Sequence, residues 1–175
     1  MNEETKKLIE RYVKPHKKIS RDVESKDIQR VLDEAVVMHD LCYLPYGIHN
    51  GGYAVAHQQI DDKDPLRFFV LRDSGRIIIN PKIVNHTRHT VDSEEGCLSF
   101  PENTPIIIQR WNKIEVEYQT IGPADEDETG KDDSEKRNNF ESLKLVDIKE
   151  GLNGLLSKIY QHEIGHFDCN YIFDI

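Results

Sequence analysis

The stretch HEIGH at residues 162–166 constrains the fold more than any other feature of this 175-residue sequence. On a helix, His162 and His166 lie one turn apart on the same face, so both imidazoles can bind one metal ion with Glu163 beside it. Many HExxH proteases take a third ligand from well downstream of the second histidine. Only FDCNYIFDI follows His166. We therefore expect an upstream ligand and a chain that folds back onto this helix.

The residues before the motif predict the helix itself. KEGLNGLLSKIYQHEIGHF, residues 149–167, is expected to be the last helix, with an apolar stripe at helical spacing formed by Leu152, Leu155, Leu156 and Ile159. Continuing the stripe leads to His162 and His166, which places them on the buried face. Two core histidines without a metal are the alternative interpretation. Their common face and the neighbouring carboxylate favour a pair of ligands.

An upstream ligand is available in SEEGCLSFP, residues 93–101. Gly96 permits close approach of the backbone, and Cys97 on an extended segment can present a thiolate to an ion held by the helix. The chain has three cysteines, an odd number without disulfide spacing, so reduced thiols are expected. We assign Cys42 and Cys169 a structural role as small buried residues.

The rest of the chain alternates between helical, extended and turn patterns. A helix is predicted for residues 26–41, with Ser25 as its N-cap, and a loop for residues 45–52. Strands are predicted at residues 53–60, 66–71, 76–81, 104–110, 113–121 and 141–148, the second and third joined by a tight turn. Residues 123–139 are almost entirely polar and strongly acidic, which favours a mobile loop insertion.

Composition limits the class of protein. With 37% apolar and 31% charged residues, residues 1–175 are expected to form a single soluble globular domain. A formal net charge of −9 argues against a groove for nucleic acid. We find no pattern typical of a signal peptide or of a membrane-spanning segment, and we expect a cytoplasmic protein without membrane association.

EGCLS at residues 95–99, followed by QHExxH at residues 161–166, resembles the peptide deformylases. These metallohydrolases remove the formyl group from N-formylmethionine on nascent chains. The resemblance implies an α+β fold with antiparallel or mixed sheets wrapped around a central C-terminal HExxH helix. It also implies that Cys97, His162 and His166 bind one divalent metal ion, Fe2+ in the cell, with Zn2+, Ni2+ or Co2+ as substitutes. The implied partners are formylated N-termini of nascent peptides, with the ribosome as a further candidate.

The sequence departs from the family in two motifs. Aligning the family's GxGxAAxQ so that its glutamine is Gln59 retains only two of the four small residues, Gly52 and Ala56. The alternative alignment uses Gln58, and we prefer Gln59. The second departure is Gly165, where the family has aspartate in HExDH; losing such an outer partner can cost 10 to 100-fold in affinity or activity. Many bacterial relatives also continue into a C-terminal helix, so we expect a divergent member.

The resemblance also assigns roles in a reaction. Glu163 would transfer protons, while the Leu98 backbone N–H and the Gln59 side chain would stabilise an oxyanion. The peptide would lie as an added strand beside Gly96 and Gly52. Its methionine side chain would enter a pocket formed partly by residues of the last helix, Leu155 and Ile159.

Two rival interpretations also fit the sequence. One is a catalytically impaired deformylase-like protein that binds a metal and a peptide. The other, a generic zinc endopeptidase, is disfavoured by the missing downstream ligand. For Glu95 and Arg110, a supporting ion pair and ordinary surface positions are equally open.

Overall fold

The computed structural model describes residues 13–45, 51–124 and 143–173. Its helical elements are the 3-10 turns η1 (Ser25–Asp27) and η2 (His57–Gln59) and the helices α2 (Ile28–Leu41) and α3 (Gly154–Phe167). The strands are β1 (Ala54–Ala56), β2 (Phe68–Leu71), β3 (Ile77–His86), β4 (Thr90–Glu95), β5 (Ile106–Trp111), β6 (Lys113–Pro123) and β7 (Leu143–Asn153). They form a five-stranded sheet in the order β1-β2-β3-β6-β7 and a two-stranded β4-β5 sheet, both antiparallel.

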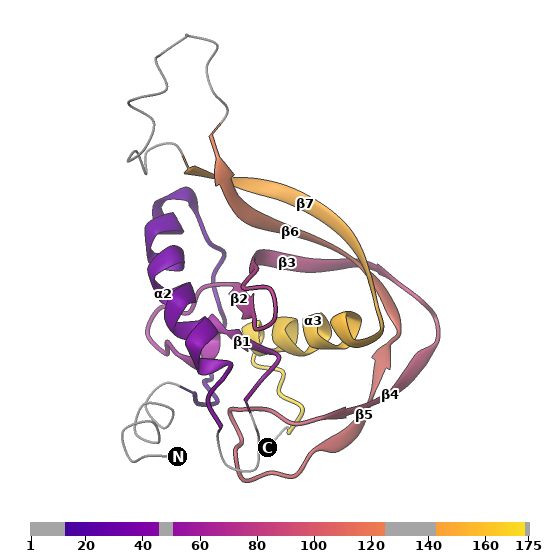
Figure 1. Ribbon diagram of the computed structural model, residues 1–175. Coiled ribbons are helices and arrows are strands. Elements are labelled where there is room, and N and C mark those ends of the chain that lie inside the picture. Colours follow the sequence, from indigo (N-terminus) through magenta and orange to yellow (C-terminus); the bar gives the residue numbers. More distant parts are fainter. Residues whose placement is uncertain (1–12, 46–50, 125–142, 174–175) are drawn as a thin grey trace, which may run out of the picture.

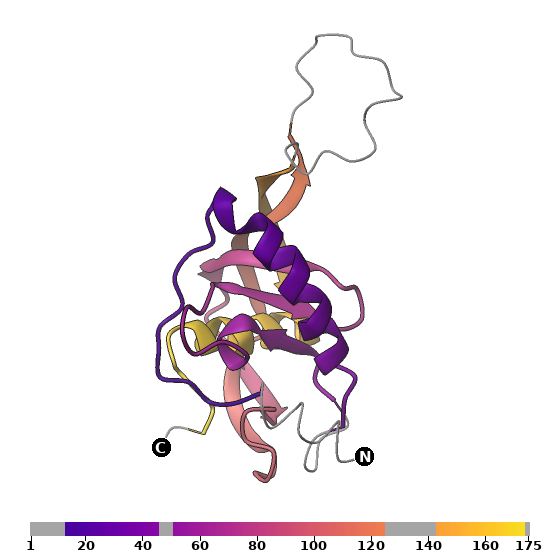
Figure 2. The same ribbon diagram turned by 90° about the vertical axis from the view of Figure 1, so that its left-hand side faces the viewer.

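The two helices pack on opposite faces of the five-stranded sheet. Successive strand residues point to opposite faces, so Phe68 and Val70 of β2 join the cluster around α2 while Phe69 joins the cluster around α3. Figure 1 shows α3 enclosed between this sheet and the β4-β5 sheet, and Figure 2 shows α2 crossing the outer face. The α+β fold around a central HExxH helix is therefore confirmed.

Helix α2 forms as the sequence predicted, but its start differs. Buried residues recur every three or four positions and face the sheet: Ile28, Val31, Ala35, Met38 and Leu41. The prediction of Ser25 as N-cap was wrong, because Ser25 begins the 3-10 turn η1 and Asp27 is the N-cap of α2. The Asp27 carboxylate accepts the Glu24 backbone N–H at 2.9 Å and pairs with Arg21 at 2.8 Å.

Most predicted strands are present. The β2-β3 hairpin turns where expected, with the Gly75 N–H donating to the Leu71 carbonyl at 2.9 Å and Gly75 at a φ of +65°. On β6 the alternating residues Ile114, Val116 and Tyr118 are buried, as predicted. The strand predicted for residues 53–60 is shorter, because residues 57–59 turn into η2. Strand β4 was missed.

The start of the last helix was also predicted wrongly. Residues 149–153 continue β7 and pair with β6, and the backbone turns into α3 at Gly154, whose φ is +57°. The predicted apolar stripe therefore crosses a junction between a strand and a helix. Leu152 is buried from the strand, whereas Leu155 and Leu156 are 54% and 42% exposed. The buried face of α3 instead carries Ser157, Tyr160, Gln161, Glu163, His166 and Phe167.

Two predicted loops fall largely outside the described residues. Residues 125–142 include most of the predicted insertion at 123–139, and residues 46–50 lie within the loop predicted for 45–52. Among the helices of the described segments, none combines the length and hydrophobicity that crossing a membrane requires.

Candidate metal centre

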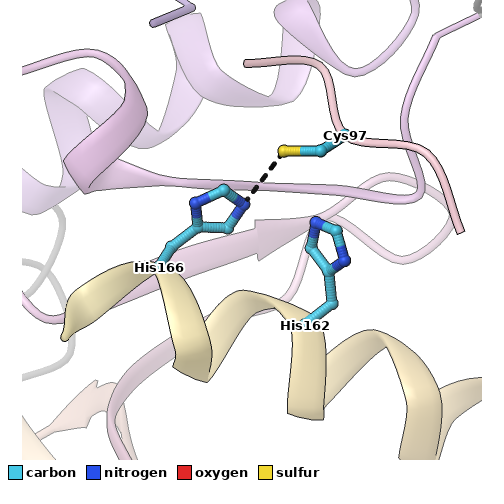
Figure 3. A group of neighbouring side chains, drawn as sticks. All are labelled: Cys97, His162 and His166. Carbon is cyan, nitrogen blue, oxygen red and sulfur yellow. Dashed lines mark hydrogen bonds between the residues drawn. The ribbon is translucent and has the colours of Figure 1, made fainter. Parts of the chain in front are cut away.

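Three side chains converge beside the last helix. His162 and His166 project from one face of α3, and Cys97 lies opposite them on the segment that follows β4 (Figure 3). Their donor atoms all lie within 4.8 Å of one another, and the Cys97 Sγ is 3.5 Å from the His166 Nε2. The upstream donor that the motif requires is thus supplied by the β4-β5 side of the molecule.

The chemistry of this donor group fits a divalent transition metal. One sulfur and two imidazole nitrogens are typical ligands of zinc and related ions, and three protein ligands leave a fourth position open. Cys97 and His162 also line a cavity at the surface, so that position can be reached from solvent. The group can therefore hold a metal ion that remains open to a small ligand.

A second group with suitable spacing is already occupied by protein contacts. Glu34, His57 and Asp61 also lie within 4.8 Å of one another. The Arg30 guanidinium bonds both carboxylates, at 3.2 Å to Glu34 and 2.5 Å to Asp61. His57 uses Nε2 toward Glu34 and accepts the Leu66 backbone N–H at Nδ1. We interpret this cluster as structural.

A chain of charged groups fixes the orientation of His162. Its Nδ1 lies 2.9 Å from Glu95 Oε2, and Arg110 donates two hydrogen bonds of 2.9 Å to the same carboxylate. Burial raises the pKa of Glu95, but the bonds from His162 and Arg110 outweigh it and lower this pKa to about 2. For His162 burial acts in the other direction and lowers the pKa. The neighbouring Cys97 and Glu95 outweigh burial and raise the pKa of His162 to about 10. Of the two interpretations of Glu95 and Arg110, the supporting ion pair is confirmed.

His166 and Glu163 have a different environment. Burial lowers the pKa of His166 below its ordinary value, and its Nδ1 has no hydrogen-bond partner among the described residues. Glu163 is buried, and its Oε2 is also without a partner in the described part of the chain. Burial raises the pKa of Glu163 to about 7. A carboxylate of such pKa at a cavity wall is suited to accept a proton and return it.

The side chains of Gln58 and Gln59 lie in different surroundings. Gln59 lines the cavity; its Oε1 accepts the Ala56 N–H at 2.9 Å and its Nε2 donates to the Ser99 Oγ at 3.0 Å. Gln58 turns away and donates to the His16 carbonyl at 2.7 Å. Only the preferred Gln59 thus lies at the cavity. Ser99 was not singled out in the sequence, although it belongs to the EGCLS stretch.

The other residues singled out in the sequence also line this cavity: Gly52, Gly96, Leu98, Leu155 and Ile159. A Cβ at Gly52 would lie 2.8 Å from the end of the Leu98 side chain and 3.1 Å from the Ala54 carbonyl oxygen, so a larger residue would make these neighbours shift. Sequence reasoning gave no role to six further lining residues, namely Gly51, Tyr53, Ala54, Ser93, Glu94 and Lys158. Ser93 and Glu94 lie on β4, a strand that was not predicted because it contains few apolar residues.

The fold and the donors define an α+β protein in which a Cys-His-His group that could hold a metal ion is built on an HExxH helix. Residues 6–175 match the sequence model of the family described as polypeptide deformylase. The chain belongs to this family, which confirms the resemblance carried by EGCLS and QHExxH.

Relatives and solved structures agree with this assignment. The chain is 31% identical to the peptide deformylase of Thermotoga neapolitana over 129 residues, which cover 72% of this chain and 63% of the relative. It thus spans less than two thirds of that relative's length. The crystal structure of the Thermotoga maritima peptide deformylase aligns at 26% identity and a TM-score of 0.65, covering 90% of this chain and 88% of the other. The deformylase of Vibrio parahaemolyticus bacteriophage VP16T, solved with actinonin, aligns at 25% identity and a TM-score of 0.62, covering 93% and 99%.

Proposed function

We propose that the protein is a peptide deformylase, a metal-dependent amide hydrolase that removes the N-formyl group from the N-terminal methionine of nascent polypeptides and releases formate. The observation that carries this proposal is the placement of Glu163 in the cavity that Cys97 and His162 line, where it is buried and one carboxylate oxygen has no hydrogen-bond partner among the described residues. Such a cavity brings metal donors and a proton acceptor to one substrate. Family membership supports the same reaction.

We propose that Cys97, His162 and His166 hold one divalent ion, Fe2+ in the cell, and that Zn2+, Ni2+ or Co2+ can replace it. When bound, such an ion supplies a Lewis acid and lowers the pKa of water toward about 7. The described residues contribute the rest of the chemistry. Glu95 and Arg110 keep the His162 ring oriented toward the cavity, as outer partners of ligating histidines do.

Glu163 is the proposed acid and base. It takes one proton from the attacking water, whose oxygen adds to the formyl carbon. The carbon–nitrogen bond then breaks, and the proton passes from Glu163 to the leaving amine while formate departs. A pKa of about 7 suits both transfers near neutral pH.

Two N–H groups are proposed to stabilise the oxyanion that forms on the formyl oxygen. The Gln59 amide has its orientation set by the Ala56 N–H, and one of its two N–H bonds is used by Ser99. The other is available to the substrate, together with the backbone N–H of Leu98. Each donor of this kind contributes roughly 3 kcal/mol in comparable sites.

The substrate is proposed to bind as an extended peptide beside Gly52 and Gly96, which both line the cavity. Its methionine side chain would pack on Leu155 and Ile159. Leu155 is 54% exposed in the free protein, and a substrate contact gives this exposed leucine a role. We propose that the protein acts in the cytoplasm on formylated nascent chains, with the ribosome as a candidate partner.

A formate-release assay tests the proposal. Protein loaded with one equivalent of Co2+ should release formate from formyl-Met-Ala-Ser, and the nearly isosteric Glu163→Gln should lose about 10² to 10⁴-fold in turnover while keeping its metal. Peptide binding without formate release by the unaltered protein would contradict deformylase activity and favour an impaired relative. A fully active Glu163→Gln would move the proton transfer to another group.

A further inference from the structure

The chain reverses direction directly after α3. The Asn170 N–H donates to the Gly165 carbonyl at 2.9 Å, and the Cys169 N–H donates to the His166 carbonyl at 3.0 Å. Cys169 itself has a φ of +58°. This pair of bonds is a Schellman motif, which here brings residues 168–173 back alongside the last turn of the helix. We call residues 168–173 the return segment.

The return segment accounts for the glycine in the HEIGH motif. A Cβ placed on Gly165 would lie 2.8 Å from the Asn170 carbonyl oxygen, a distance that packed structures do not tolerate. Backbone atoms thus occupy the space that a side chain at this position would need. Gly165, which looked in the sequence like the loss of a supporting aspartate, is instead required by the path of the return segment.

Tyr171 of this segment contacts the metal-binding group and its surroundings. Its ring meets the His166 ring edge to face, with centroids 5.0 Å apart. Its hydroxyl donates to Gln58 Oε1 at 2.6 Å and accepts the His16 N–H at 2.8 Å. Because Gln58 directly precedes Gln59, the tyrosine joins a candidate metal ligand to the segment that carries the proposed oxyanion donor.

The same ring also reaches the cysteine segment. Phe100, three residues after Cys97, packs edge to face on Tyr171 with centroids 5.5 Å apart. Phe173 contacts the Phe100 ring from the return segment at 5.4 Å. The segments bearing Cys97 and His166 therefore meet at one aromatic cluster, formed by Phe100, Tyr171 and Phe173.

His166 depends on such packing because the described residues offer no hydrogen bond to its Nδ1. Metal-binding histidines are usually oriented by a partner at the second ring nitrogen. We propose that Tyr171 is a positioning residue: by packing on His166 and Phe100 and bonding Gln58, it holds the metal ligands and the Gln59 segment in register. The return segment thereby sets the metal affinity. This inference rests on the metal site of the proposed function, not on its substrate.

Zinc affinity separates this role from a merely structural one. The metal-free variants Tyr171→Leu and Tyr171→Phe are titrated with Zn2+ against a chromophoric chelator, and urea unfolding is measured without metal. We expect Tyr171→Leu to weaken zinc binding about 10-fold or more and Tyr171→Phe, which keeps the ring, to weaken it less. Tyr43→Leu is the control, since Tyr43 is exposed and does not line the cavity; its zinc affinity should not change.

Unchanged zinc affinity in Tyr171→Leu, with lower metal-free stability alone, would overturn the proposal. If Tyr171→Leu does not fold, Tyr171→Phe decides the question by its turnover. Loss of the hydroxyl should lower kcat more than it raises KM, because it loosens the Gln59 segment, and unchanged kcat would count against the proposal. Formate release by the unaltered protein is measured separately. If the unaltered protein releases no formate but the variants show the expected differences in zinc affinity, the proposed function is contradicted and the proposed role of Tyr171 is retained.

Discussion

The two histidines of the candidate metal-binding group lie one helical turn apart, yet the molecule orients them by different means. His162 bonds to Glu95, which is held by Arg110, so its position depends on buried charges. His166 is held by the Tyr171 ring and has no hydrogen bond at Nδ1 within the described part of the chain. Equivalent positions in the motif thus depend on unlike supports, one electrostatic and one steric.

This difference appears in the pKa values as well. Cys97 and Glu95 raise the pKa of His162 against burial, whereas burial acts on His166 without such compensation and lowers its pKa. Breaking the electrostatic support leaves a buried charge without its partner, while breaking the steric support leaves a gap or a collision. The two sides should therefore respond differently to substitution and to pH.

The largest change in stability is expected when the charged groups that support His162 are altered. Arg110→Met should lower the free energy of unfolding of the metal-free protein by about 3 kcal/mol, the lower end for a broken buried ion pair, because Glu95 loses the guanidinium and keeps only His162 as a charged partner. Urea unfolding measures this change. Adding Glu95→Gln to Arg110→Met should restore part of the stability, since the stranded charge is removed. A loss below about 1 kcal/mol for Arg110→Met would show that the pair contributes no more than a surface salt bridge.

The pH dependence of metal-free stability should differ between the two histidines. The folded pKa of His162 is raised to about 10, so its contribution is present below pH 6.5 and is lost as the pH rises toward 10. The folded pKa of His166 is lowered, so this residue destabilises the fold as the pH falls below 6.5. Unfolding at several pH values should show that His162→Asn flattens the alkaline slope. An unchanged slope in this variant would assign the dependence to other groups.

Where α3 packs against the return segment, Gly165→Ala should lower the free energy of unfolding by about 1–3 kcal/mol, because the new Cβ meets the Asn170 carbonyl oxygen. Alanine otherwise stabilises a helix relative to glycine by about 1 kcal/mol, so the sign of the change is informative. Gly151→Ala on strand β7 is a control for a Cβ added in open space, since nothing lies within 4 Å of it. Equal effects of the two substitutions in thermal unfolding would argue against a collision at Gly165.

How far the sequence predicted this site depended on the kind of interaction. The sequence singled out Cys97, His162 and His166, which the structure brings together, because ligand chemistry requires few residue types at fixed spacing. Tyr171 was not singled out, because its contacts with Gln58 and Phe100 exist only after the chain has reversed. Positioning by packing leaves no comparable motif in a single sequence.

The same contrast holds for the fold. The alternation on β6 predicted its buried face correctly, since one face of that strand packs on α3. Strand β4 reads TVDSEE and offers no such alternation, because its one buried residue, Ser93, is polar and lines the cavity. The start of the last helix was predicted too early, because the leucines on both sides of Gly154 have the spacing of one continuous helical stripe.

Titration of the metal-free protein with Co2+ tests most directly whether the two differently supported histidines share one ion with Cys97. Binding should saturate at about one equivalent and produce the near-ultraviolet band of a thiolate bound to cobalt. Cys97→Ser should abolish that band, and His162→Ala and His166→Ala should each weaken binding. Absence of saturable binding, or a thiolate band that persists in Cys97→Ser, would contradict the proposed metal centre.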